Sequence, residues 1–190
     1  MNEAYLKLYE QVKNLTEKPR TVLNRSDLTR AAVLVPIVFR EQEPHFVLTK
    51  RTMTVAHHKG QISFPGGVRE PEDKNEVENA LREAREEIGL DQNKVEAAGL
   101  LDDFVPITGF AVTPVVGFVD SKAHFELDPK EVEEIFEAPL SIFLDPKNHE
   151  IETAIRGTGR RFHRYRYLNY DIWGATAGIM IQENWDESVQ

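Results

Sequence analysis

The sequence contains no cysteine, and this absence excludes disulfide bonds, thiolate metal sites and cysteine nucleophiles. No apolar run approaches the ~20 residues needed to span a membrane, so we expect no membrane segment. Residues 1–4, MNEA, do not begin a basic and then apolar leader, so we expect no secretory signal. These absences agree with a cytoplasmic protein.

Positive charge is also scarce, with 23 Lys and Arg residues against 32 Asp and Glu residues and a formal net charge of −9. This balance argues against a general nucleic-acid binder, which would show a basic face. It does not argue against a phosphorylated small molecule, because a local basic patch with a bound metal ion holds an anion on an acidic protein. The length of 190 residues suits one domain with a good core, and no repeat or linker divides it.

Hydrophobic periodicity predicts an α+β fold over the whole chain, 1–190. The predicted elements are a helical appendage over about 2–17, strands over 30–39, 45–51 and 61–64, a central helix before Gly89, strands over 95–101 and 111–119, a short acidic helix over 129–136, a hairpin of 151–156 and 161–168 and a final helix from a cap at Asp171 to about Ser188. Pro36 predicts an edge or a bulge in its strand, and Pro114 an interruption. The turn signal of the hairpin is Gly157-Thr158-Gly159-Arg160.

The stretch 64–90, FPGGVREPEDKNEVENALREAREEIGL, is the one around which we expect the rest to be organised. At about 100° per residue, its helix has a narrow apolar stripe beside an acidic face. The stripe consists of Val77, Leu81, Ala84 and Ile88, and the acidic face of Glu83, Glu86 and Glu87.

Such a face is ordinarily solvated. Here like charges one turn apart cost about 0.2–0.5 kcal/mol each. Glu86 and Glu87 also stand near the helix end, where the macrodipole disfavours acids. A divalent cation removes both objections, since Mg²⁺ takes a few carboxylates, several waters and substrate phosphates.

From Arg82 to Leu90 the sequence matches the second half of the Nudix box, with Ala84 at an aliphatic position, so the chain resembles the Nudix hydrolases. The first half is one residue longer than the pattern, so that Gly67 serves as its glycine and Asp73 as its acid. Two further segments, LTKR at 48–51 and HKGQISFPGG at 58–67, resemble the region before the box in the coenzyme A pyrophosphatase branch. The longer box is also seen in that branch, and DIWGATA at 171–177 is similar to the start of its last helix.

This resemblance implies an α/β/α sandwich around a mixed sheet, and metal-dependent hydrolysis of a nucleoside diphosphate derivative. It assigns Glu83, Glu86 and Glu87 as Mg²⁺ or Mn²⁺ ligands, with Arg82 bracing Glu86. The resemblance also implies that the backbone of Gly66 or Gly67 adds a carbonyl oxygen to the metal site.

The general base and the substrate contacts stay open. Glu83 is the local candidate for the base, and the remote candidates are Glu131, Glu133 and Glu134. Arg51 and Lys59 are expected phosphate contacts, and for His58 two roles stay open, a hydrogen bond to phosphate or an acid. Coenzyme A carries an extra 3′-phosphate that needs its own cation, for which Arg51 is the first choice.

Three functions therefore compete. The first is cleavage of coenzyme A or its acyl esters to 3′,5′-ADP and phosphopantetheine. The second is hydrolysis of another nucleotide, such as ADP-ribose, an ADP-sugar or a damaged nucleoside triphosphate. The third is a nucleotide sensor without activity, which the retained carboxylates disfavour. A homodimer is expected from family habit alone.

Overall fold

The computed structural model describes residues 3–53, 60–106, 109–153 and 161–182. Its elements in chain order are α1 (Glu3–Thr16), β1 (Thr29–Arg40), β2 (Glu43–Arg51), β3 (Ile62–Ser63), β4 (Gly66–Val68), α2 (Glu76–Ile88), η1 (Gln92–Lys94), β5 (Val95–Leu100), β6 (Phe110–Val119), β7 (Val132–Pro139), α3 (Leu140–Leu144), η2 (Pro146–Asn148), β8 (His149–Thr153), β9 (Arg161–Tyr167), β10 (Tyr170–Trp173) and α4 (Gly174–Gln182). None of the described helices has the length and apolar character needed to cross a membrane.

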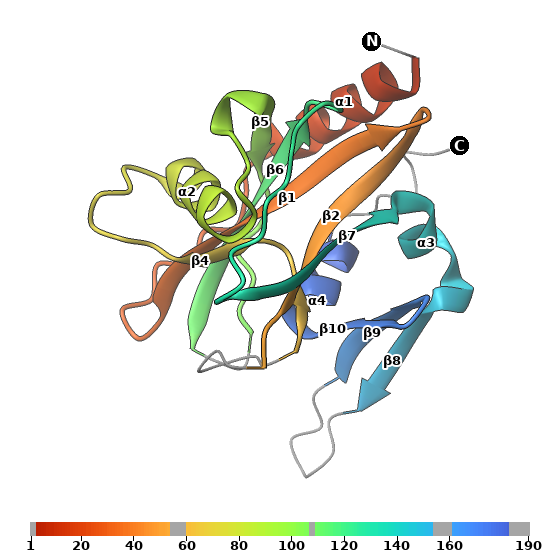
Figure 1. Ribbon diagram of the computed structural model, residues 1–190. Helices are drawn as coiled ribbons and strands as arrows, with labels where there is room; N and C mark the ends of the chain where they lie inside the picture. The colour runs from red at the N-terminus through yellow and green to blue at the C-terminus, as the bar shows by residue number, and fades with distance from the viewer. Residues whose placement is uncertain (1–2, 54–59, 107–108, 154–160, 183–190) are drawn as a thin grey trace.

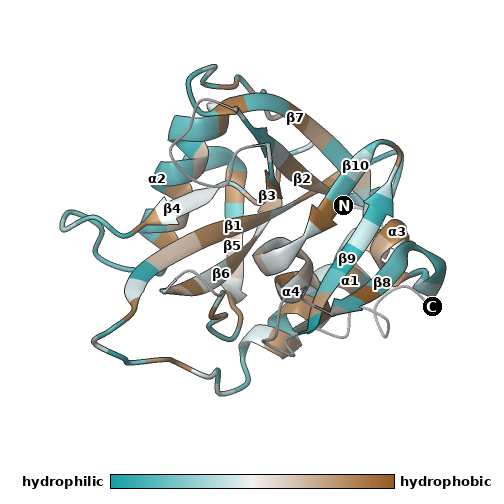
Figure 2. Cartoon of the chain, turned by 90° about the horizontal axis from the view of Figure 1, so that it is seen from below, coloured by the Kyte–Doolittle hydropathy of each residue, from teal (hydrophilic) through white to brown (hydrophobic). Residues whose placement is uncertain are grey.

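A mixed sheet forms the centre of the molecule (Figure 1). Its strands follow the order β3-β2-β1-β6-β5, with β7 added to β2 and β4 added to β1. The pair β1–β6 is parallel, while the other pairs are antiparallel. In Figure 2, α2 lies on one side of this sheet, and α1, α3 and α4 lie on the other. The expected α+β sandwich around a mixed sheet is confirmed.

Strand β1 shows why both faces are covered. Ala32, Leu34 and Val38 pack with α2, whereas Val35 and Ile37 pack with the helices of the opposite face. A strand buried on both faces reads as a continuous apolar run, as this one does. Each fully buried Leu or Ile stabilises the fold by about 1.5–3 kcal/mol. The N-terminal helix α1 adds two buried side chains to the second face, so it is part of the core.

The two prolines lie within continuous strands, so the predicted edge or bulge at Pro36 and the predicted interruption at Pro114 are wrong. The parallel pair β1–β6 runs past both, with Pro36 opposite Gly117. The other side of β1 explains the tolerance, because pairing with β4 ends at Val33 and pairing with β2 begins at Ile37. Pro36 falls in the gap between these partners, where a missing N–H costs little.

The predicted acidic helix over 129–136 is also wrong, because most of this segment belongs to strand β7. Val132, Phe136 and Ala138 are buried at even positions, which is the two-residue period of a strand. The backbone of β7 pairs antiparallel with β2, with a register shift between Lys50 and Arg51. The edge of β2 satisfies backbone groups that an isolated short helix would leave exposed.

The last part of the chain forms a second sheet, ordered β10-β9-β8. The predicted hairpin is confirmed by the antiparallel pairing of β8 with β9, while its turn lies outside the described residues. The predicted helix cap at Asp171 is wrong, because this residue belongs to β10 and forms an ion pair with Arg164 at 3.0 Å. The final helix begins instead at Gly174, and Ser188 lies outside the described residues.

Candidate active site

Helix α2 presents its acidic face to the site because its caps and its apolar face fix its rotation. Asn75 caps the start by accepting a hydrogen bond from the Glu78 N–H at 2.9 Å. Gly89 ends the helix in the left-handed region, with φ of 62°, as predicted. Ala84 and Ile88 are fully buried against the sheet, so the carboxylates beside them lie along its margin.

Glu87 is the most deeply buried of the three carboxylates, with 2% of its side chain exposed. The Arg51 Nη1 group donates to Glu87 Oε1 at 2.7 Å, and the Gly66 N–H donates to Oε2 at 3.2 Å. Burial raises the pKa of Glu87 to about 7, although Arg51 acts in the opposite direction. A carboxylate on a solvated face would not be buried, so the structure excludes that interpretation for Glu87.

Glu83 lies over the backbone of Gly67. A Cβ atom placed on Gly67 would be 2.5 Å from the Glu83 carboxylate, closer than atoms pack, so a side chain here would displace the acid. Burial raises the pKa of Glu83, while Arg82 lowers it and nearby Glu86 and Glu131 add to the rise. The close approach gives a physical reason for glycine at 67.

Arg82 connects the carboxylates of α2 to the loop before the helix. Its Nη1 group lies 2.9 Å from Glu83 Oε1 and 3.0 Å from Glu86 Oε2, so the predicted brace on Glu86 is present. On its other side, Nε and Nη2 contact the two Asp73 oxygens at 3.1 and 3.0 Å. This bidentate contact lowers the pKa of Asp73. The extra residue in the box therefore leaves Asp73 within reach of Arg82.

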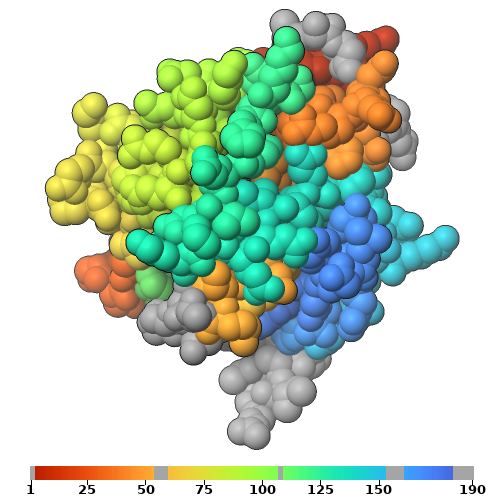
Figure 3. All heavy atoms as spheres, in the orientation of Figure 1, coloured from red at the N-terminus to blue at the C-terminus, as the bar shows by residue number. Residues whose placement is uncertain are grey.

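The segment leading into β7 lies against α2 (Figure 3). Its backbone bonds to the end of α2, with the Asp128 N–H donating to the Glu87 carbonyl at 3.0 Å. Arg51 Nη2 reaches Glu131 Oε2 at 3.3 Å, and the Thr52 N–H donates to the Glu131 carbonyl at 2.9 Å. Glu131 is thereby brought to the carboxylates of α2.

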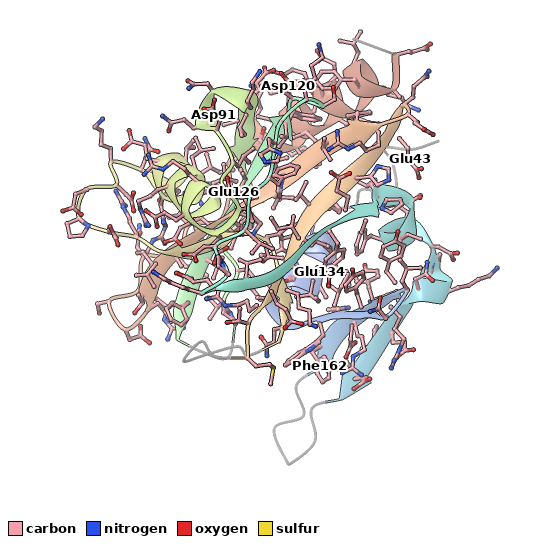
Figure 4. All side chains as sticks on the ribbon, viewed as in Figure 1. Glu43, Asp91, Asp120, Glu126, Glu134 and Phe162 are labelled. Carbon is pink, nitrogen blue, oxygen red and sulfur yellow. The ribbon has the colours of Figure 1, made fainter. Side chains whose placement is uncertain are left out.

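The other two remote candidates are engaged elsewhere. Glu134, labelled on β7 in Figure 4, accepts a hydrogen bond from the Tyr170 hydroxyl at 2.6 Å. Tyr170 packs with the face opposite α2, where it stacks on Phe136 with ring centroids 3.7 Å apart. Glu133 pairs with Lys50 at 2.7 Å. Neither joins the cluster, and His58 and Lys59 lie outside the described residues.

Comparison with known proteins agrees with this geometry. The profile of the NUDIX domain matches residues 28–165. The chain belongs to the Nudix family. A relative from Enterobacter sp. (strain 638), named as the uncharacterized Nudix hydrolase NudL, is 42% identical over 85% of this chain and 82% of its own length. The NudL of Photorhabdus laumondii is 40% identical over 80% of this chain and 81% of its own length.

Solved Nudix structures share the fold. A MutT/nudix family protein from Enterococcus faecalis superposes with a TM-score of 0.52 and 13% identity, over 96% of this chain and 73% of its own. An Ap4A hydrolase from C. elegans gives a TM-score of 0.51 and 18% identity, over 60% of this chain and 82% of its own. The protein is thus a Nudix hydrolase, an enzyme that acts on pyrophosphate bonds of nucleoside diphosphate derivatives.

Nudix hydrolases generally use divalent metal ions, and the donor set of this chain fits one. Among the described residues no three acidic or histidine side chains are grouped as metal ligands, and Arg51 and Arg82 contact the carboxylates of α2. Even so, carboxylates at the margin of α2 offer hard oxygen ligands, and Mg²⁺ needs few of these because it keeps several waters. Burial of Glu83 and Glu87 disfavours their charge unless a cation lies beside them.

Sequence reasoning missed a buried network at the start of α2. The side chain of Asp103 is fully buried and forms ion pairs with Arg20 and Arg30, each at 2.9 Å. It also accepts a hydrogen bond from the Thr113 hydroxyl at 2.6 Å. Arg30 also reaches Glu76 in the first turn of α2 at 3.1 Å. The network ties the helix to β1 and β6. The only sequence signal was an acidic residue before an apolar strand, which equally suggests turn capping.

Proposed function

We propose that this Nudix hydrolase cleaves the diphosphate of coenzyme A or acyl-coenzyme A, giving 3′,5′-ADP and phosphopantetheine or its acyl ester. The observation that carries the proposal is the position of Arg51. It belongs to the upstream motif that resembles the coenzyme A pyrophosphatase branch, and its guanidinium lies 2.7 Å from Glu87. A segment with a branch-specific resemblance thus contributes directly to the cluster on α2.

In this proposal Glu83, Glu86 and Glu87 hold Mg²⁺ or Mn²⁺. The ion would neutralise phosphate oxygens, orient the diphosphate and lower the pKa of a bound water. Arg82 keeps Glu83 and Glu86 in place through its contacts at 2.9 and 3.0 Å. The absence of a side chain at Gly67 leaves the space that the Glu83 carboxylate fills.

For the general base we propose Glu131. Its side chain is 49% exposed, and its contact with Arg51 is long at 3.3 Å. Glu83, the local candidate, is instead held by Arg82 and packed on Gly67. Glu134 is bonded to Tyr170, so the structure supplies no support for it.

For Arg51 we propose the diphosphate in place of the 3′-phosphate, since its guanidinium contacts a carboxylate assigned to the metal. For the 3′-phosphate of coenzyme A we propose Lys59 and His58, which belong to the same upstream motif. Removing the 3′-phosphate from the substrate should therefore weaken binding without changing the reacting centre.

Turnover of coenzyme A, 3′-dephospho-coenzyme A and ADP-ribose with Mg²⁺ or Mn²⁺ tests the assignment, with the products separated by chromatography. We expect the highest kcat/KM with coenzyme A and 3′,5′-ADP among its products. Equal or greater kcat/KM with ADP-ribose would contradict the proposal and favour a hydrolase of other nucleotides. The absence of hydrolysis across a nucleotide panel would indicate a sensor. Light scattering of the purified chain tests the proposed homodimer.

A further inference from the structure

Arg51 donates a hydrogen bond to Glu87, a carboxylate that the proposed function assigns as a metal ligand. Its Nη1 group is 2.7 Å from Glu87 Oε1, while the Gly66 N–H holds the other oxygen at 3.2 Å. Both oxygens of this nearly buried carboxylate are therefore engaged among the described residues. A Mg²⁺ ion binds oxygen at about 2.0–2.1 Å. A divalent ion and the guanidinium at the same oxygen would lie within about 4 Å and repel each other.

Arg82 is placed differently, although it also contacts carboxylates of α2. Besides Glu83 and Glu86, it makes the bidentate pair with Asp73 and donates to the Val68 carbonyl at 3.0 Å. The contacts with Asp73 and Val68 do not involve the two glutamates, so they hold Arg82 in place when a cation neutralises Glu83 and Glu86. Among the described residues, the side chain of Arg51 has one partner besides Glu87, the half-exposed Glu131 at 3.3 Å.

The backbone around Arg51 is fixed while its side chain reaches the surface. The Arg51 N–H donates to the Gln61 carbonyl at 3.0 Å, and the Gly60 N–H donates to the Arg51 carbonyl at 3.1 Å. The register of β2 with β7 shifts at this residue, and such irregularities re-aim side chains. With 20% of its side chain exposed, Arg51 is partly accessible to solvent.

We propose that Arg51 exchanges partners during the catalytic cycle. It neutralises Glu87 when no metal is bound, and it turns to the diphosphate of the substrate when a divalent ion takes Glu87. Metal loading thus creates an anion site, and the two binding events are coupled through one side chain. This inference rests on the proposed function for the metal ligands, but not on coenzyme A as the substrate.

The exchange predicts effects of opposite sign when Arg51 is replaced. Arg51→Gln removes the cation that competes with the metal, so Mg²⁺ alone should bind about tenfold more tightly. The same variant lacks the guanidinium for the diphosphate, so methylenediphosphonate should bind the Mg²⁺-loaded protein about tenfold more weakly. Arg51→Lys should give intermediate values for both.

Two binding measurements test this without reference to turnover. Mg²⁺ affinity is obtained from the rise in unfolding temperature with Mg²⁺ concentration, relative to the metal-free state of each variant. It is measured at pH 8.5, where carboxyl groups are ionised. Calorimetric titration gives the affinity for methylenediphosphonate, a diphosphate that cannot be hydrolysed, at saturating Mg²⁺. Lys50→Gln is the matched control, since Lys50 precedes Arg51 and pairs with Glu133, and it should change neither affinity.

Equal or weaker Mg²⁺ affinity in Arg51→Gln, with Arg51→Lys agreeing, would overturn the exchange while leaving the proposed function intact. If the unmodified protein itself binds no Mg²⁺, the exchange and the metal assignment fail together. Binding of both probes without hydrolysis of coenzyme A would overturn the substrate assignment alone, because neither probe contains a nucleotide.

Discussion

Replacing Gly67 by alanine should change the catalytic rate strongly and the unfolding free energy little. A Cβ atom at this position would lie 2.5 Å from the Glu83 carboxylate, whereas ordinary contact begins at 3.4 Å. The carboxylate therefore has to move by the difference, about 0.9 Å. Because it is the end of a flexible side chain, it can move without shifting the backbone. We expect unfolding free energy to change by less than about 1 kcal/mol.

Catalysis should respond far more strongly than stability. A misplacement of about 1 Å in a group that positions the reacting atoms lowers the rate by about 100-fold. Gly67→Ala should therefore lower kcat about 100-fold with coenzyme A, measured at saturating Mg²⁺. Chemical denaturation of the same preparation gives the unfolding free energy.

Gly66→Ala is the matched control. Its Cβ would lie 2.4 Å from the Ala32 carbonyl oxygen and 2.6 Å from the Val33 Cα, both in the backbone of β1. Backbone atoms within a paired strand have little freedom to move, so we expect destabilisation of at least about 2 kcal/mol. A Gly67→Ala protein of unchanged kcat would refute the reasoning, as would one destabilised as much as Gly66→Ala.

Four further predictions concern the carboxylates. Glu87→Gln should lower turnover by about three orders of magnitude or more, with an unchanged circular dichroism spectrum. With metal chelated, the unfolding free energy of the unmodified protein should fall by up to about 3 kcal/mol relative to that of Glu87→Gln as the pH rises from about 4.5 to 7. The reason is that the pKa of Glu87 is higher in the folded than in the unfolded chain, so its ionisation destabilises the fold. A difference in unfolding free energy that does not change with pH would contradict this. Asp73→Asn should lower kcat about tenfold and cost about 1–3 kcal/mol at pH 7, a cost that vanishes as the pH falls through the lowered pKa of Asp73. Glu131→Gln should lower kcat about 100-fold or more, whereas Glu134→Gln should leave it within about twofold; equal effects would exclude Glu131 as the base.

Local periodicity determined the central features of this protein. The helical repeat predicts α2, because neighbours three and four residues apart share a face in any α-helix. It also predicts that Ala84 lies on the buried face and Glu83 on the acidic face. Gly89 predicts the left-handed end of the helix. The brace from Arg82 to Glu86 is such a local pair, and it is present at 3.0 Å. The family follows from the same segment.

Strand β7 could not be derived locally. The run from Val132 to Phe136 places apolar residues where either a short helix or a strand could bury them. The unpaired edge of β2 decides between them, and that edge exists only after the sheet has formed. The error had a functional consequence, because a helix gives no reason to separate Glu131 from Glu134. Pairing of β7 with β2 brings Glu131, the residue before β7, to Arg51 and leaves Glu134 with Tyr170.

The sequence by itself determined which side chains carry the charge and on which face of α2 they stand. Only the tertiary structure decided how deeply each carboxylate is buried and which cation it meets. Arg51 and Glu87 are 36 residues apart, and their contact depends on the register of β2 with β7 and on the packing of α2. Burial and long-range pairing set the pKa of Glu87, and neither is encoded in the spacing of a single segment.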